Sequence, residues 1–148
     1  MQNQLEKIKE ATILLAEDDA GHASLIEKNL RRGNITNPIV RVDNGQAVLD
    51  YLQTKLAGEQ GRPAAPLLLL LDLNMPVMDG YEVLTHMKAD EHMKHIPVIV
   101  LTTTNDPREV KRCYELGCNA YVTKPVDADD FCKAIRQLGL FLSVVSIV

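Results

Sequence analysis

The sequence predicts an α/β protein with a doubly wound parallel sheet of five strands flanked by five helices. Short apolar runs alternate along the chain with segments whose apolar residues recur at helical spacing, which is the pattern of repeated strand–helix units. The runs are apolar almost throughout, as is typical of strands that helices cover on both faces of a sheet. A helix between successive strands implies right-handed crossovers, so we expect all strands to run parallel.

The first half of the chain holds two strand–helix units. Thr12–Ala16 (TILLA) is the first strand candidate, and three apolar residues recur at helical spacing after it. Ile39–Val42 is the second strand candidate. Gln46–Leu56 is predicted to be a helix because four of its apolar residues fall on one helical face.

The third unit begins with Leu67–Leu71, five leucines in succession. A run that is apolar on both faces indicates a buried strand. The helix that follows carries Val83, Leu84 and Met87 on one face. Pro97–Leu101 (PVIVL) is the fourth strand candidate.

The last two helices have recognisable end signals. Residues 106–109 (DPRE) are typical of a helix N-terminus, with Asp at the N-cap, Pro at the first helical position and an acidic residue at the third. Gly117 is well suited to end that helix. Ala120–Thr123 is the fifth strand candidate, and Asp127 is predicted to cap a last helix that runs to about residue 137.

Length and composition limit the classes of function. The 148 residues fit one compact domain, and 46% hydrophobic with 24% charged residues is typical of a soluble globular protein. A formal net charge of −4, without clustered Lys and Arg, argues against a nucleic-acid surface. Cys113, Cys118 and Cys132 lack metal-ligand spacing, so we expect them to be reduced packing residues.

The two ends of the chain show no signal peptide and no membrane-spanning pattern. Residues 1–11 form a polar N-terminal extension without the apolar core of a signal peptide. Residues 139–148 form an apolar C-terminal extension of about half the length needed to cross a bilayer. We therefore expect a cytoplasmic protein without a membrane partner, whose main domain spans residues 12–138.

Polar side chains follow four of the five predicted strands. In an open doubly wound sheet, ligands bind beyond the carboxyl ends of the strands, so these residues would share one edge. They are Glu17, Asp18 and Asp19 after the first strand, Asp72 after the third, Thr102, Thr103 and Thr104 after the fourth, and Lys124 after the fifth. The second strand ends in what looks like a simple turn.

This combination of groups suits the binding and transfer of a phosphoryl group. Glu17, Asp18 and Asp72 would repel one another in a partly desolvated cleft, and a hard cation such as Mg²⁺ relieves that repulsion. We expect Asp18 and Asp72 to be direct ligands and Glu17 to act through water. Lys124 would neutralise charge on the phosphoryl oxygens, and the Thr102 hydroxyl would donate a hydrogen bond to one of them. Positioning and charge compensation are most of what phosphoryl transfer requires. Asp72 would then be the nucleophile that becomes an acyl phosphate.

Each of these residues alone has a structural explanation. An Asp after a buried strand is most often a turn former or a helix N-cap, and we interpret Asp19 as the cap of the first helix. Thr103 is interpreted as a β-former or cap, and a lone Lys-Pro is nearly uninformative. The prediction of a phosphoryl site depends on all four strand ends carrying these groups together.

The motifs ILLAEDD, LLLLLDLNMPVMDG, PVIVLTTT and YVTKP together resemble those of the response regulator receiver domain of two-component signalling. The resemblance implies a flavodoxin-like sheet with strand order 2-1-3-4-5. It implies that Asp72 takes a phosphoryl group from the phosphohistidine of a sensor histidine kinase. The main-chain carbonyl of Asn74 would complete the Mg²⁺ shell with Asp18 and Asp72. Such a regulator is not an enzyme for other substrates, because it catalyses only its own phosphorylation and dephosphorylation.

The resemblance also implies a conformational switch. Thr102 would move toward the phosphoryl oxygens, and Tyr121 would turn inward to fill the vacated space. The helix at 106–116, the strand at 120–123 and the last helix would form the output surface. Two packings separated by a few kcal/mol would be biased by the new charge at Asp72.

Two further expectations concern the neighbourhood of the phosphoryl group. The bond between Lys124 and Pro125 is often cis in this family, and X–Pro bonds disfavour that isomer only weakly. Asn74 and Thr104 lie two residues beyond Asp72 and Thr102, where they would flank the path of the water that attacks the acyl phosphate. We expect both to set the phosphoryl lifetime.

A narrower likeness concerns the small single-domain regulators paired with bacterial phytochromes. The segments LLLDLNMP, IPVIVLTTTND and AYVTKP, followed by an apolar tail, are similar to those proteins, which commonly dimerise. A phytochrome is thus the candidate sensor kinase. Exposed apolar runs tend to be covered, so the tail is predicted either to pack within the monomer or to form a homodimer contact. The candidate contact residues are Phe141, Leu142, Val144 and Val145.

Other functions fit the sequence less well. A phosphatase of the haloacid-dehalogenase type also uses an Asp nucleophile after an apolar strand, with Thr or Ser, Lys and Mg²⁺, but it usually has a second Asp where Asn74 stands. A nucleotide-binding module would need a glycine-rich phosphate loop, which the sequence lacks. A pseudo-receiver would not need the full set of site residues. The message of a single-domain regulator would pass by protein contact, by relay, or by acting as a phosphate sink.

Overall fold

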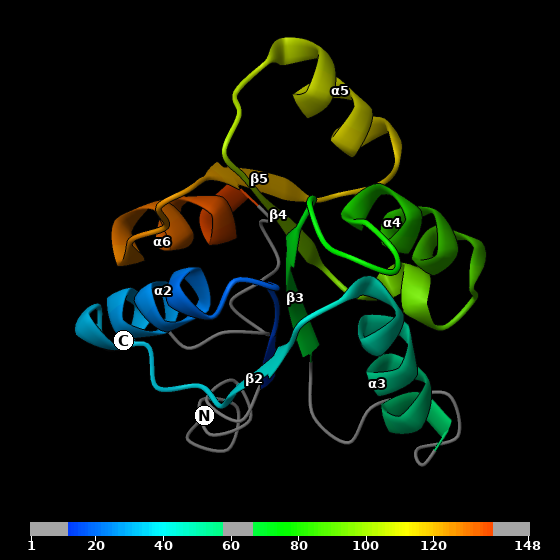
Figure 1. Cartoon of the computed structure of the whole chain (residues 1–148), viewed down its shortest axis with the longest axis horizontal. Coiled ribbons are helices and arrows are strands. Elements are labelled where there is room, and N and C mark those ends of the chain that lie inside the picture. Colours follow the sequence, from blue (N-terminus) through cyan, green and yellow to red (C-terminus); the bar gives the residue numbers. More distant parts are fainter. Residues whose placement is uncertain (1–11, 58–66, 138–148) are drawn as a thin grey trace.

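The chain folds around a five-stranded sheet in which every strand runs parallel to its neighbours (Figure 1). The structure is a computed structural model that describes residues 12–57 and 67–137. Its strands lie in the order β2-β1-β3-β4-β5, which confirms the predicted order. The strands are β1 (Thr12–Ala16), β2 (Ile39–Val42), β3 (Leu67–Asp72), β4 (Val98–Thr102) and β5 (Ala120–Thr123).

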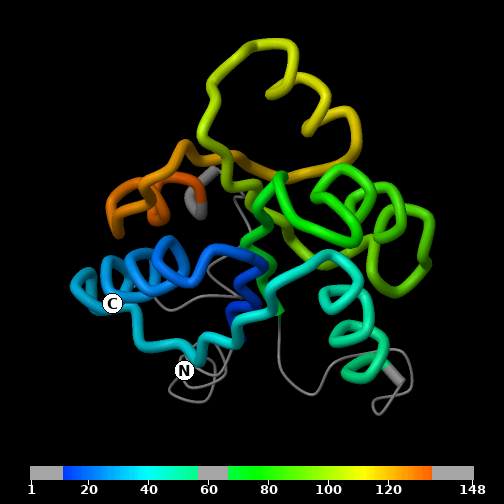
Figure 2. Tube along the Cα trace, viewed as in Figure 1, coloured from blue at the N-terminus to red at the C-terminus, as the bar shows by residue number. Residues whose placement is uncertain are grey.

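Helices cover both faces of the sheet, as the sequence predicts. They are α2 (Ala20–Arg32), α3 (Gly45–Ala57), α4 (Gly80–Ala89), α5 (Pro107–Glu115) and α6 (Ala128–Gln137), with a short 3₁₀ turn, η1 (Met93–His95). Figures 1 and 2 show α2 and α6 side by side on one face, and buried residues of α3, α4 and α5 pack on the other. The fold is therefore doubly wound and flavodoxin-like.

Two hydrophobic cores result from the alternation of side chains along the buried strands. In β3, Leu68 and Leu70 pack with α2 and α6, whereas Leu67, Leu69 and Leu71 pack with the three helices of the opposite face. Every residue of this strand is buried. Burial of a leucine side chain contributes about 2 kcal/mol relative to exposure, which explains why an unbroken leucine run forms the central strand.

Short polar caps begin the helices that follow the strand ends. Asp19 accepts a hydrogen bond from the His22 N–H at 2.9 Å and caps α2, which confirms its interpretation as a cap. Asp106 caps α5 and Asp127 accepts from the N–H of Asp130 at the start of α6. Gly117 follows α5 with a φ of +106°, a left-handed conformation that glycine adopts without strain.

Two strands end one residue later than the sequence predicts. β3 includes Asp72, because Asp72 still pairs with Leu101 of β4. β4 begins at Val98 rather than Pro97 and ends at Thr102. Proline has no N–H to donate to a ladder, although its carbonyl still accepts from the Leu69 N–H at 3.0 Å.

The three cysteines lie in the interior of the fold. Cys113, Cys118 and Cys132 are buried, as predicted for packing residues. Burial raises the pKa of the Cys118 thiol to about 12, so this thiol stays protonated. Within residues 12–57 and 67–137, none of the helices has the length and apolar character of a membrane span.

Candidate functional site

The sheet itself brings three charged side chains to one place. The alternation that puts Leu70 on the α2/α6 face continues to Asp72, two residues later. Glu17 follows β1 and Lys124 follows β5 with the same alternation. Since β1, β3, β4 and β5 are neighbours in the sheet, these side chains converge above its carboxyl edge.

Lys124 lies between two buried carboxylates. Its Nζ contacts Oε1 of Glu17 and lies 3.2 Å from Oδ1 of Asp72. The Lys124 side chain is only 9% exposed, and Glu17 and Asp72 are buried. The main chain of Lys124 is fixed as well, because its N–H donates to the carbonyl of Thr102 at 2.7 Å. The predicted approach of Lys124 to Asp72 is thus present.

The two carboxylates differ in how well their charge is compensated. Burial raises the pKa of Asp72 to about 6, with Lys124 acting to lower it and Glu17 to raise it. Burial also opposes ionisation of Glu17, but hydrogen bonds from Lys124 and from the Asp19 N–H bring its pKa below the ordinary value. Lys124 therefore compensates mainly the charge of Glu17, and the charge of Asp72 still lacks a full counterion.

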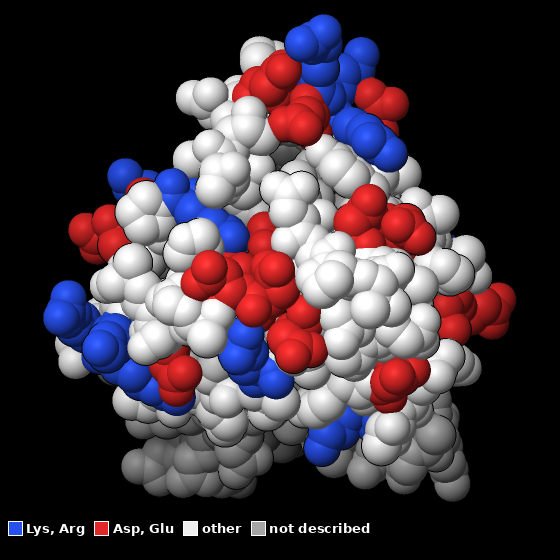
Figure 3. Space-filling view, viewed as in Figure 1, with Lys and Arg blue, Asp and Glu red and all other residues white. Residues whose placement is uncertain are grey.

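The acidic residues form a set that can hold a metal ion. One carboxylate oxygen from each of Glu17, Asp18 and Asp72 lies within 4.8 Å of the others. Figure 3 shows acidic side chains gathered near the centre of the face in view, where Figure 1 draws the end of β1 as the dark blue strand. Oxygen donors of this kind fit a hard divalent cation. Because Glu17 is already paired with Lys124, Asp18 and Asp72 are the better candidates for direct ligands.

The residues after Asp72 and Thr102 form two tight turns beside the acidic set. The N–H of Asn74 points to Oδ1 of Asp72 at 3.4 Å, and Asn74 is exposed. Thr102 is buried, and its hydroxyl oxygen accepts from the N–H of Thr104 at 3.1 Å. Thr104 in turn accepts from the N–H of Asp106, the cap of α5. Both predicted lifetime residues therefore border the site.

The loop after β3 returns close to Asp72 because of a glycine. The N–H of Gly80 donates to the carbonyl of Leu73 at 2.9 Å. A Cβ at position 80 would lie 2.7 Å from the carbonyl oxygen of Asp72, so only glycine allows this approach. Asp79 accepts from the Glu82 N–H and begins α4 at the same point.

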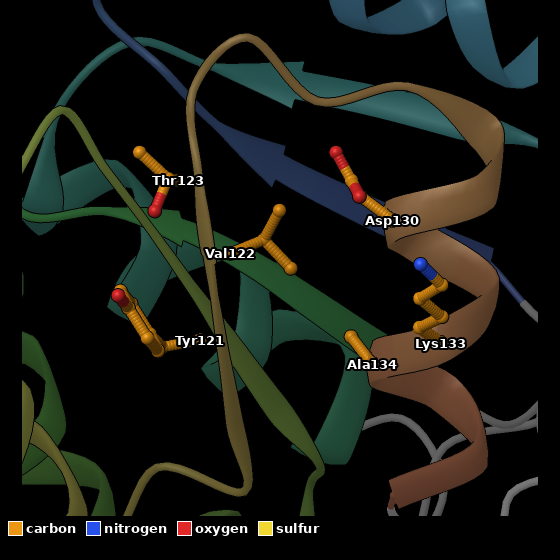
Figure 4. Close-up of a pocket in the computed structure, with 6 residues that line it drawn as sticks. All are labelled: Tyr121, Val122, Thr123, Asp130, Lys133 and Ala134. Atoms are coloured by element: carbon orange, nitrogen blue, oxygen red, sulfur yellow. The ribbon is translucent and has the colours of Figure 1, made fainter. Parts of the chain in front are cut away.

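Tyr121 lies on β5, with its side chain half-buried against the core of α3, α4 and α5. Val122 points toward α6, whereas Tyr121 and Thr123 lie on the other side of the strand (Figure 4). A surface pocket of about 230 Å³ opens between this strand and α6, where Asp130 and Lys133 also line it. Tyr121 thus shares a face of the sheet with Thr102, as a switch of the predicted kind requires.

Two residues near the acidic set were not predicted from the sequence. Arg41 of β2 donates to the main-chain carbonyls of Glu17 and Asp18, both at 3.0 Å. His22 of α2 places Nδ1 3.9 Å from Oε1 of Glu17, an ion pair when the imidazole is protonated. The only available signal was a single charged residue in the strand IVRV, which an exposed edge strand explains equally well.

The remaining predictions have mixed outcomes. The bond between Lys124 and Pro125 is cis, as the resemblance implies. The candidate dimer residues lie outside the described residues, in the apolar extension 139–148. The domain limits at residues 12 and 138 and the roles assigned to the individual site residues stay predictions.

Comparison with known proteins identifies the family. A family model described as the response regulator receiver domain matches residues 13–136. The chain belongs to this family. Its relatives include the response regulator Rcp1 of Synechocystis sp., which is 36% identical over 129 residues that make up 87% of this chain and 86% of Rcp1. This receiver is therefore a response regulator related to Rcp1.

Solved structures of response regulators agree with this assignment. The bacteriophytochrome response regulator AtBRR is 39% identical and superposes with a TM-score of 0.77, covering 89% of this chain and 94% of AtBRR. The phosphorylated cyanobacterial phytochrome response regulator RcpA is 33% identical, with a TM-score of 0.67 and coverage of 88% and 91%. The Mn²⁺-bound form of Rcp1 is 34% identical, with a TM-score of 0.66 and coverage of 92% and 97%. The receiver thus resembles regulators named for their phytochromes.

Proposed function

We propose that Asp72 accepts a phosphoryl group from the phosphohistidine of a sensor histidine kinase. The observation that supports this most directly is a buried carboxylate at the end of β3, with Lys124 Nζ at 3.2 Å and two more acidic side chains beside it. A pKa of about 6 leaves Asp72 largely ionised at neutral pH, as a nucleophile must be. Family membership supports the donor, because receiver domains take their phosphoryl group from histidine kinases.

The transfer is a substitution at phosphorus. An oxygen of Asp72 forms a new O–P bond while the N–P bond of the phosphohistidine breaks, and that bond's electron pair returns to the imidazole nitrogen. Lys124 Nζ lies 3.2 Å from Oδ1 of Asp72 and would compensate the charge of the phosphoryl oxygens, and we assign the Thr102 hydroxyl the same task. The buried surroundings of Asp72 strengthen both interactions, since little water screens them.

We propose Mg²⁺ as the physiological cation. Asp18 and Asp72 would hold it directly, with the main-chain carbonyl of Asn74, while Glu17 would act through water. When bound, such an ion neutralises charge on the phosphoryl oxygens and on the ligands. The Mn²⁺-bound form of Rcp1 supports a divalent cation in a related protein, and the carboxylate oxygens here suit the harder Mg²⁺.

The test is the mass of the intact protein after incubation with phosphoramidate or acetyl phosphate and Mg²⁺. We expect the protein to gain one phosphoryl group, and we expect Asp72→Asn or excess EDTA to prevent the gain. Asp79→Asn is the matched control, because Asn can still cap α4 and phosphorylation should persist. A protein that gains no mass with any donor, or an Asp72→Asn variant that still does, would refute the assignment.

We propose a phytochrome as the cognate kinase, since AtBRR and RcpA are named for phytochromes and align with most of this chain. Phosphotransfer from a phytochrome kinase should be faster than transfer from an unrelated histidine kinase at equal concentration. Equal rates from both would remove the support for this pairing.

We propose that the output is a switch at Thr102 and Tyr121 that changes the surface of α5, β5 and α6. The phosphorylated and free forms should then differ in the NMR signals of this surface. If only signals around Asp72 change, a phosphate sink or relay is the better description.

We also propose that the protein does not act on other phosphate esters, so an aryl phosphate such as p-nitrophenyl phosphate should not turn over.

We propose that the apolar extension contributes to a homodimer through Phe141, Leu142, Val144 and Val145. Sedimentation equilibrium of a chain ending at Gln137 should show less self-association than the full chain, and unchanged association would refute the contact. A cytoplasmic location is proposed because an odd number of cysteines, all of them buried, suits a reducing compartment. Cell fractionation would test it.

A further inference from the structure

Arg41 holds the backbone of the segment that carries Glu17 and Asp18. It lies on β2, the edge strand next to β1. Its Nε donates to the carbonyl of Glu17 and a terminal guanidinium nitrogen donates to the carbonyl of Asp18, both at 3.0 Å. The two contacts use the fork of the guanidinium group, which can address two neighbouring acceptors at once.

These carbonyls lie just beyond the last main-chain hydrogen bonds between β1 and β2. The β1–β2 ladder ends with Ala16 paired to Val42, and the Glu17 N–H makes a last bond to the Val42 carbonyl at 3.1 Å. After that the chain leaves the sheet to begin α2. Beyond the ladder, β2 still binds Glu17 and Asp18, through hydrogen bonds from the Arg41 side chain rather than from the main chain.

The segment is fixed from its other side as well. Asp19 begins α2 as its N-cap, and the Asp19 N–H donates to Oε2 of Glu17 at 3.2 Å. Asp18 therefore sits between two anchors, Arg41 and the helix cap. Its side chain is exposed, so packing does not fix the carboxylate and the backbone must decide where it points.

We infer that Arg41 is a positioning residue that holds Asp18 in place for the divalent cation. The inference rests on the proposed function, because it assumes that Asp18 is a cation ligand. Outer contacts that orient a ligand commonly change metal affinity by about tenfold or more when they are removed.

The charge of Arg41 acts in the opposite direction from its geometry. A positive charge beside the acidic set weakens cation binding by repulsion, so its removal alone would tighten binding. Loss of the two hydrogen bonds would loosen Asp18 and weaken binding. The sign of the change therefore separates positioning from a charge effect.

The test uses Arg41→Met and Arg41→Lys, with Mg²⁺ affinity measured by NMR titration of the labelled protein. Met keeps the apolar stem and loses the charge, whereas Lys keeps the charge but lacks the fork. We expect Arg41→Lys to bind Mg²⁺ about tenfold more weakly, and Arg41→Met to bind it more weakly by a smaller factor, because the lost charge offsets part of the lost positioning. Amide hydrogen exchange at residues 18 and 19 in EDTA should also be faster in both.

Arg31→Met is the matched control. Arg31 also donates to two main-chain carbonyls, those of Ile35 and Asn37, but in the loop that enters β2 at its other end. It should leave Mg²⁺ affinity unchanged. An Arg41 variant that binds Mg²⁺ more weakly while amide hydrogen exchange at residues 18 and 19 stays unchanged would oppose the inference.

The remaining outcomes are equally decisive. Tighter binding in Arg41→Met with no change in Arg41→Lys would show a charge effect only and overturn the inference. Unchanged affinity in both variants, or an equal loss in Arg31→Met, would overturn it too. If the unsubstituted protein itself binds no Mg²⁺, the proposed function fails instead, so the two failures are distinguishable.

Discussion

Lys124 is shared unequally between two buried carboxylates, and that inequality supports the proposal that Asp72 is the reactive one. Contact with Lys124 keeps Glu17 ionised, whereas Asp72 has a pKa of about 6 and an incompletely compensated charge. An incoming cation or phosphoryl group would therefore change the state of Asp72 more than that of Glu17. The same residues that form the buried ion pair at this edge would then set the proposed chemistry.

Removal of Lys124 should destabilise the fold, since Glu17 would be left as a buried, unpaired charge. We expect Lys124→Met to lower the free energy of unfolding by about 3 kcal/mol. Adding Glu17→Gln should recover more than half of the loss, because the double variant buries no uncompensated ion there. Urea denaturation in EDTA measures both variants.

A surface ion pair provides the comparison for that experiment. Lys111 and Glu115 of α5 approach to 3.9 Å, and their side chains are 79% and 65% exposed. Lys111→Met should cost less than about 1 kcal/mol. If Lys124→Met costs no more than Lys111→Met, the buried contact has little energetic importance.

Asn74 and Thr104 are expected to control how long the phosphoryl group survives. Both border the site through hydrogen bonds to the side chains of Asp72 and Thr102. Substitutions that change bulk or charge, such as Asn74→Arg and Thr104→Ala, should alter the decay rate of the phosphoprotein severalfold without changing the fold. Mass spectrometry over time measures the decay. Thr103→Ala is the control, because Thr103 is exposed although it lies only two residues after Leu101, the residue of β4 that pairs with Asp72.

Residue types at strand ends were predictable from the sequence, but their pairings were not. The alternation of strands and helices, with one strand order, brings Glu17, Asp72 and Lys124 together, as predicted. The choice of Lys124 between two carboxylates depends on rotamers of long side chains, which no sequence pattern encodes. The contact of Arg41 with main-chain carbonyls was missed for the same reason.

At the scale of elements, the edge strand β2 supports both halves of the site although its own end looked like a simple turn. Arg41 holds the segment before α2, and Gly45 at the start of α3 lies under the loop that follows β3. A Cβ at position 45 would lie 2.1 Å from the carbonyl oxygen of Met78. Patterns along one strand predict that strand, but they do not reveal which distant loop touches its end.

Gly45→Ala should therefore disturb the loop after Asp72. The added methyl group meets main chain rather than a flexible side chain, so we expect a loss of about 2 kcal/mol in the free energy of unfolding. Gly21→Ala in the exposed first turn of α2 meets only the Asp19 carboxylate at 3.1 Å and should change stability by less than about 1 kcal/mol. Thermal and urea denaturation compare the two, and equal effects would contradict the role of the close approach.

At the scale of the whole molecule, the function depends on one strand order that places four strand ends at a common edge. Two cores, one on each face of the sheet, hold those strands, and the polar site lies where both cores end. Such a site costs stability, because Asp72 must be buried without a full counterion. The cost should be visible in the pH dependence of unfolding.

Asp72→Asn should stabilise the metal-free protein at neutral pH. The folded-state pKa of about 6 lies above the ordinary value of 3.8, so the folded state binds the proton more tightly than the unfolded state. The stability associated with this proton is present below pH 3.8 and is lost as the pH rises through 6. We expect a gain of about 1 to 3 kcal/mol at pH 7.5, reduced to about a third of that at pH 4.5.

Urea denaturation of both proteins in EDTA at the two pH values measures this gain. Asp79→Asn, which alters a helix cap in the same loop, should change stability by a similar small amount at both pH values. Mg²⁺ should remove much of the advantage of Asp72→Asn, because an ionised Asp72 gains a counterion that the amide cannot bind as well. If Asp72→Asn is less stable than the parent at pH 7.5, or its gain does not shrink at pH 4.5, the buried charge of Asp72 does not govern the stability of this fold.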